Sequence, residues 1–258
     1  MEIYCLMENT ASGVDFLSEH GLSLFIDTGK HKILFDMGQS DGFSENAKKL
    51  GLDLGTVDIA ILSHGHYDHG GGLKKFLEIN DQASVYMSSH AFEPHYNGTS
   101  KYIGLDVALK DSGRIIFTEN TVNIDTGITL FSCNDRKKEF DLGSFGLTVF
   151  RNGEHIPDDF YHEQYLLIEE NGKRILFSGC SHRGILNIAS WFKADIIIGG
   201  FHFSKLPLDN TLDSYAKYLD NFNTKYYTCH CTGVEQYEHM KKHMKRLHYI
   251  SGGEKIVI

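Results

Sequence analysis

Short apolar runs of strand length recur along most of the chain. Many are rich in β-branched or aromatic residues and end at Gly, Asn or Asp, which is typical of strands. The pattern predicts strands at residues 22–26, 32–35, 59–62, 84–87, 114–117, 128–131, 147–150, 165–168, 174–177, 196–198 and 225–228. The chain is therefore expected to be built largely on β-sheets.

Apolar residues at helical spacing alternate with these strands. They predict helices at residues 44–50, 184–192, 212–222 and 234–247. An early β-rich part, followed by strands mixed with helices, favours an α/β protein with a two-sheet core and helices outside it. We find no internal repeat or low-complexity linker, and only three prolines. A single domain over residues 1–258 is expected.

Composition and charge narrow the class of partner. The formal net charge is −9, and the one dense basic cluster, at 241–246, is expected to be a solvated helix face. Nucleic acid is therefore disfavoured as a partner, and a small molecule is favoured. No stretch is long and apolar enough to cross a membrane. The lack of a secretory signal and the odd count of five cysteines predict a cytoplasmic protein with reduced thiols.

The strongest chemical signal is the sequence Ser-His-Gly-His-Tyr-Asp-His at 63–69, called here the histidine run. It follows a short apolar strand and forms a polar loop, so its candidate ligands are attached to a rigid element. His64 and His66 lie two apart, point to the same side of an extended chain and can share one metal. Asp68 and His69 follow, where the loop turns towards a helix, and can reach a second ion nearby. A dinuclear metal site is predicted.

The glycines of this loop are expected to assist the site. Gly65 and the three glycines at 70–72 have no side chain, so the backbone can crowd round the ions. Glycine also adopts positive φ at little cost, and we expect these positions to use that freedom where the loop turns.

Two adjacent ions need more ligands than one loop supplies, and two later strands end in the same way. Cys180 and His182 follow the strand at 174–177 and are both candidate ligands, since a thiolate suits zinc. His230 is the candidate after the strand at 225–228. Cys229 and Cys231 flank it, but no second Cys/His pair completes a structural zinc site.

The other histidines are less specific. His202 ends the strand at 196–198 and is a candidate to contact the substrate or to support a ligand. Weaker candidates are His90, His155 and His162. We expect solvated helix positions for His239, His243 and His248.

These motifs together resemble the metallo-β-lactamase superfamily, whose signature His-x-His-x-Asp-His stands at 64–69. Segments 19–24, 34–38, 178–185, 199–202 and 230–233 resemble more specifically the dihydropterin-(ribofuranosyl)aminobenzene-phosphate synthase-like branch. The resemblance extends from about residue 8 to the last residues. It implies an α/β protein with a four-layer αββα sandwich, in which two mixed sheets lie back to back with a dinuclear site at one edge.

The resemblance also implies a ligand set. One ion would be held by His64, His66 and His182, and the other by Asp68, His69 and His230. Many members of the superfamily carry a bridging Asp where this chain has Cys180, which leaves the coordination around that position open. The ions would be two divalent metals, zinc first, with manganese, iron and magnesium as alternatives.

The implied function is a metal-dependent hydrolase or synthase-like enzyme acting on an anionic, phosphate-bearing small molecule. Asp68 would bind a metal and orient an attacking water, or the ions would stabilise a leaving pyrophosphate. Arg183 is a candidate to steer an anionic substrate. An iron-dependent oxidoreductase on the same fold and a non-catalytic metal-binding module are the alternatives. Neither the oligomeric state nor the substrate is predicted.

Overall fold

A computed structural model describes all 258 residues. The chain divides into two compact units, each assembled from segments that are distant in sequence. Unit 1 comprises Met1–Glu119, Ser144–Gln164 and Ser251–Ile258, and unit 2 comprises Asn120–Gly143 and Tyr165–Ile250. The single domain expected over residues 1–258 stays a prediction.

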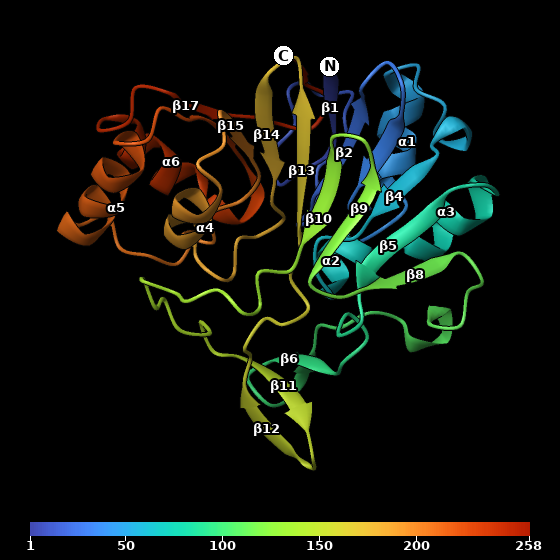
Figure 1. Cartoon of the computed structure of the whole chain (residues 1–258), viewed down its shortest axis with the longest axis horizontal. Helices are drawn as coiled ribbons and strands as arrows, with labels where there is room; N and C mark the ends of the chain where they lie inside the picture. Colours follow the sequence, from blue (N-terminus) through green and yellow to red (C-terminus); the bar gives the residue numbers. More distant parts are fainter. The chain divides into compact units, whose positions relative to one another are not determined.

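Unit 1 is built on a seven-stranded mixed sheet (Figure 1). In spatial order its strands are β18 (Lys255–Val257), β1 (Glu2–Met7), β2 (Ser23–Asp27), β3 (Lys32–Phe35), β4 (Ile59–Ile61), β5 (Ser84–Ser88) and β8 (Ile115–Thr118). The pairs from β18 to β3 are antiparallel, and those from β3 to β8 are parallel. The three residues of β4 are all buried, so the chain that leaves this strand starts from a fixed position.

Helices α1 (Gly42–Lys49) and α3 (Leu73–Ile79) and the 3-10 helix η1 (Leu54–Thr56) pack on this sheet. Phe43 of α1 and Phe76 of α3 are fully buried in one apolar cluster with side chains of the strands. A smaller four-stranded sheet completes unit 1. Its order is β12 (Glu154–Pro157), β11 (Leu147–Arg151), β6 (His95–Asn97) and β7 (Lys101–Tyr102). The 3-10 helix η2 spans Val107–Leu109.

Unit 2 has a seven-stranded mixed sheet of its own (Figure 1). The order is β17 (Leu247–Tyr249), β16 (Lys225–Thr228), β15 (Ile196–Ile198), β14 (Lys173–Phe177), β13 (Tyr165–Glu170), β10 (Ile128–Phe131) and β9 (Thr121–Asp125). Helices α4 (Ile185–Phe192), α5 (Asn210–Asp220) and α6 (Val234–Lys241) bury apolar side chains with those of the sheet. Because β14 to β17 are parallel, the segments that follow them leave the same edge of the sheet.

The predicted strands are all present, with ends displaced by a few residues. The last predicted helix is too long, because α6 ends at Lys241 and the chain turns into β17. Met240, Met244 and Leu247 are buried at helical spacing, yet only the first belongs to the helix. The expected loop after β4 contains a one-turn helix, α2 (Tyr67–Gly70). None of the helices combines the length and apolar character needed to cross a bilayer. The cytoplasmic location stays a prediction.

Candidate metal centre

Unit 1 brings the four candidate ligands of the histidine run together. His66 is extended, with φ −98° and ψ 148°, and caps α2, which carries Asp68 and His69. The ring centroid of His64 lies 4.7 Å from that of His66 and 4.1 Å from that of His69. Asp68 Oδ2 lies 3.8 Å from His69 Nε2. All four side chains are buried, so their mutual approach is part of the packed interior.

A buried carboxylate sets the protons of two of these rings. Asp36, which is fully buried, accepts hydrogen bonds from His69 Nδ1 at 2.6 Å and from Ser63 Oγ at 2.7 Å. Because Ser63 Oγ donates its proton to Asp36, it can only accept from His64 Nδ1, which lies 2.8 Å away. His64 and His69 therefore carry their protons on Nδ1 and keep the Nε2 lone pairs, which is the form that a metal ligand needs. The donor set fits a divalent metal.

Close backbone contacts explain why glycines occupy this loop, but the prediction that they adopt positive φ is wrong. Gly65 and the glycines at 70–72 all lie outside the positive-φ region. A Cβ on Gly65 would lie 2.1 Å from the carbonyl oxygen of Ala91, and one on Gly71 would lie 2.3 Å from that of Gln39. These glycines are required because neighbouring backbone segments press against the loop.

His66 adjoins a second buried cluster of unit 1, formed with His95, Asp158 and His162. The ligand atoms of the four side chains lie within 4.8 Å of one another. His95 Nδ1 lies 2.8 Å from Asp158 Oδ2, and Gly65 N donates to His162 Nδ1 at 2.8 Å. From the sequence His162 is only a weak candidate, and His95 and Asp158 have no predicted role, since no local spacing links them to the histidine run.

Burial disfavours the charged form of two rings of this cluster, those of His66 and His162. Burial and then the neighbouring His95 lower the pKa of His162 to about 4. Burial also lowers the pKa of His66 well below its usual range. Burial acts to raise the pKa of Asp158, but attraction and hydrogen bonds from His162 and His95 outweigh it and hold that pKa well below the usual range. The carboxylate of Asp158 therefore lies beside the neutral rings of His66 and His162.

His20 is a further residue to which sequence analysis assigned no role. Its Nε2 lies 3.3 Å from Asp68 Oδ2, and more than half of its side chain is exposed. A Cβ on the adjacent Gly21 would lie 2.6 Å from the carbonyl oxygen of Asp68, so the two segments are in close backbone contact. His20 therefore stands at the exposed side of the Asp68 carboxylate.

The later candidates all belong to unit 2, in the segments that follow β14, β15 and β16. Ligand atoms of Cys180 and His230 lie within 4.8 Å of each other, and the ring centroids of His182 and His202 are 4.3 Å apart. His202 and His230 adopt positive φ, 57° and 50°. Parallel strands thus bring together four residues that are up to 50 positions apart in the chain.

Cys231 joins this group, although sequence analysis regarded it only as a neighbour of His230. Its Sγ donates to the carbonyl oxygen of Cys180 at 3.5 Å and accepts from His202 N at 3.3 Å. Burial acts to raise the pKa of the Cys231 thiol, but interactions with the side chains of Cys180 and His202 dominate and lower it well below the usual range.

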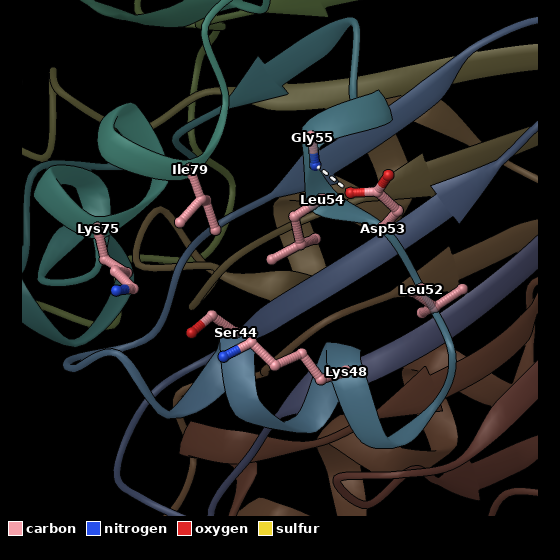
Figure 2. A pocket seen from close by; sticks show the side chains of 8 residues that line it. All are labelled: Ser44, Lys48, Leu52, Asp53, Leu54, Gly55, Lys75 and Ile79. Carbon is pink, nitrogen blue, oxygen red and sulfur yellow. Dashed lines mark hydrogen bonds between the residues drawn. The ribbon is translucent and has the colours of Figure 1, made fainter.

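A pocket of about 170 Å³ in unit 1 lies apart from these residues (Figure 2). It is lined by Ser44, Lys48, Leu52, Asp53, Leu54, Gly55, Lys75 and Ile79. Asp53 accepts a hydrogen bond from Gly55 N at 2.9 Å and so caps η1 beside it. The pocket contains no predicted site residue.

Comparison with known proteins defines the class. A model of the metallo-β-lactamase superfamily matches residues 19–220, and the chain belongs to this superfamily. A protein of Methanocaldococcus jannaschii named 7,8-dihydropterin-6-methyl-4-(β-D-ribofuranosyl)-aminobenzene-5'-phosphate synthase is 31% identical, with 96% of this chain and 94% of that protein covered. An uncharacterized protein of the same organism is 32% identical over 90% of this chain and 91% of its own length. The resemblance to this branch is confirmed.

Solved structures agree. A metal-dependent hydrolase of the β-lactamase superfamily superposes with a TM-score of 0.86 at 30% identity, covering 100% of this chain and 99% of that chain. Zn²⁺-bound PqqB from Methylobacterium extorquens has a TM-score of 0.60 at 12% identity over the full length of both chains, which shows the fold alone. The predicted α/β fold of the metallo-β-lactamase type is confirmed, and a metal-dependent enzyme is supported.

Proposed function

We propose that this chain binds two divalent ions, zinc first, and uses them on an anionic, phosphate-bearing small molecule. The observation that carries the proposal is the buried arrangement of Asp36 and Ser63, which leaves the Nε2 lone pairs of His64 and His69 free of protons. A metal-ligating histidine typically donates its other N–H to a carboxylate or a similar acceptor, and the rings of His64 and His69 both do so.

The proposed ligands are those of the family resemblance. One ion takes His64, His66 and His182, and the other takes Asp68, His69 and His230. Cys180 is a further candidate ligand, and His202 a candidate supporting residue. Membership of the superfamily supports this assignment, as does the burial of each ligand.

When bound, two such ions make water more acidic and neutralise negative charge that develops on oxygen. The chain itself contributes orientation. Asp68 is buried on one side, and His20 lies 3.3 Å from its carboxylate on the other. In a hydrolase Asp68 would accept a hydrogen bond from the attacking water. In a transferase, an arylamine nitrogen would bond to a methylene carbon as its C–O bond to pyrophosphate breaks, and the nitrogen would lose a proton.

Metal content is the first test. Zinc, manganese and iron are measured by mass spectrometry on protein purified without added metal and after reconstitution. We expect two ions per chain, and we expect His66→Ala and Asp68→Ala each to lose metal. His31→Ala is the matched control, because His31 pairs with Asp58 at 2.6 Å on the surface of the same unit. Full metal content in both site variants would contradict the site.

Substrate class is the second test. Reconstituted protein is assayed with phosphodiesters, lactones and thioesters, and with a dihydropterin pyrophosphate plus an arylamine phosphate, where pyrophosphate release is measured. The 31% identical synthase favours the transfer reaction. Turnover of the hydrolytic substrates alone would favour a hydrolase. Iron bound in preference to zinc, with redox activity, would instead favour the oxidoreductase, and no turnover with any metal would favour a binding module.

A further inference from the structure

A carboxylate–histidine pair stands behind His66, in unit 1. His95 begins β6, and Asp158 follows β12 of the same four-stranded sheet. Both side chains are completely buried, and His95 Nδ1 lies 2.8 Å from Asp158 Oδ2. The other oxygen, Oδ1, accepts from Phe160 N at 2.8 Å. Burying a charged group is costly unless it is paired and hydrogen-bonded, so both residues depend on these contacts.

The hydrogen-bond pattern sets the proton on His95. The ionised Asp158 can only accept, so His95 Nδ1 carries the proton that it donates. The Nε2 of His95 therefore holds a lone pair, and this buried atom has no hydrogen-bond partner within the protein. This nitrogen can therefore accept a hydrogen bond from a neighbouring donor.

His66 is placed to provide that donor. The two rings are edge-on, with an interplanar angle of 79° and centroids 5.5 Å apart. A linear N–H···N hydrogen bond of about 2.9 Å between two imidazoles puts their centroids roughly 5 Å apart, so a small shift closes the contact. The ring of His162 is nearer to His95, at 3.9 Å, but at 35° it lies over the face of His95 rather than in line with its nitrogen.

We propose that His95 and Asp158 are positioning residues that hold a proton on the ring nitrogen of His66 facing His95. The second nitrogen of His66 then keeps its lone pair for a metal ion. This inference rests on the proposed function, in which His66 is a ligand. It assigns to His66 what Asp36 and Ser63 do for His64 and His69, so every histidine of the run has a buried acceptor that defines its proton.

Hydrogen bonding argues against a third ion at this cluster itself. Both oxygens of Asp158 already accept hydrogen bonds. His162 Nδ1 accepts from Gly65 N, so the proton of this neutral ring is on Nε2, which lies 3.5 Å from Asp158 Oδ2. His162 therefore offers no lone pair to a cation, and each oxygen of Asp158 already has a hydrogen-bond donor, so a support for His66 fits this arrangement better.

The sharpest test is Asp158→Asn. The amide oxygen can keep the bond from Phe160 N, and the amide nitrogen then donates to His95 Nδ1. This moves the His95 proton to Nε2, where it opposes the proton of His66. We expect zinc affinity, measured by competition with a chromophoric chelator, to fall about 10- to 100-fold. Long-range ¹H–¹⁵N spectra of the zinc-loaded protein should show the His95 proton on Nδ1 in the wild type and on Nε2 in the variant.

A second pair of variants covers the case in which Asp158→Asn does not fold. His95→Gln places an amide oxygen near the position of Nε2 and should bind zinc within a few-fold of wild type, whereas His95→Phe should lose about tenfold or more. Equal zinc affinity of the two would overturn the proposal. Asp58→Asn is the control, since it alters a His–Asp pair of 2.6 Å just before β4, at the opposite end of that strand from the histidine run.

The two proposals fail differently. Wild-type protein that binds no zinc, or zinc binding that His66→Ala leaves intact, contradicts the proposed function. Zinc binding that His66→Ala weakens strongly but Asp158→Asn leaves within twofold contradicts only the positioning role of His95 and Asp158.

Discussion

Replacing Asp36 by Asn tests whether the metal site depends on proton placement. Asp36 accepts from Ser63 N at 2.7 Å, from Ser63 Oγ at 2.7 Å and from His69 Nδ1 at 2.6 Å. Asn retains the size of Asp and tolerates the φ of 60° at this position. Its amide nitrogen would face His69 Nδ1 as a donor, which drives the His69 proton to Nε2 and removes the lone pair meant for the ion.

The size of the effect follows from these contacts. Loss of a carboxylate that supports a metal-ligating histidine typically weakens metal binding 10- to 100-fold, equivalent to about 1.4–2.8 kcal/mol. Hydrogen bonds to a charged group contribute about 1.5–3 kcal/mol each, and two side-chain bonds are altered. We therefore expect Asp36→Asn to lower both the zinc affinity and the urea midpoint of the metal-free protein, with saturating zinc restoring part of the stability.

Chelator competition and urea unfolding followed by circular dichroism measure the two quantities separately. Asp36→Ala is a useful comparison, because it adds about 1–2 kcal/mol of strain from the positive φ to the loss of the hydrogen bonds. Asp58→Asn should change neither quantity by much. A folded Asp36→Asn protein with wild-type zinc affinity would refute the idea that Asp36 sets the proton of His69.

Three further outcomes are expected. Gly65→Ala should lower the free energy of unfolding in urea by about 1–3 kcal/mol, because its Cβ would lie 2.1 Å from a backbone oxygen. Gly113→Ala is the control, since its Cβ meets nothing within 4 Å and the change should be near neutral. Equal effects of the two substitutions would show that the clash is not the cause. Arg151→Gln should destabilise by about 1 kcal/mol at pH 7, since Arg151 holds Glu93 at 2.5 Å, both side chains partly exposed. Burial acts to raise the pKa of Glu93, but Arg151 dominates and lowers it below 4.5. The stabilisation is therefore present above pH 4.5 and is lost as the pH falls through the lowered pKa. The difference in urea midpoint between wild type and Arg151→Gln should accordingly disappear in acid. A constant difference from pH 7 to pH 3 would indicate that Arg151 stabilises the protein through packing instead. Cys180→Ser should weaken binding of one zinc ion roughly tenfold or more if the thiolate is a ligand, and unchanged affinity in titration would leave Cys180 a packing role.

Local signals in the sequence predicted much of this protein. The strands were recognisable because runs such as Ile59–Ile61 and Ile196–Ile198 are apolar throughout and buried throughout. By contrast β9 and β12 contain no buried residue, so no apolar pattern marks them. The helix expected to reach Leu247 was overextended because buried residues beyond α6 continue the helical spacing by chance.

The candidate site divides in the same way. The histidine run was recognisable because its ligands lie within six positions of one another. The residues that set their protons were not, since Asp36 lies 33 positions from His69 and Asp158 lies 63 positions from His95. Such partners are defined by which strands pair and by where buried donors and acceptors meet, and a single sequence carries no local trace of either.

The hydrogen bond from Gly65 N to His162 joins residues 97 positions apart. Closing a loop of that length costs conformational entropy, which the packing of the strands of unit 1 must offset. A peptide or a designed scaffold that carries only residues 63–69 would reproduce the ligands and none of the groups that prepare them. Engineering this centre into another protein therefore requires the supporting residues from both sheets of unit 1, and Asp36, His95 and Asp158 are among the first to transfer.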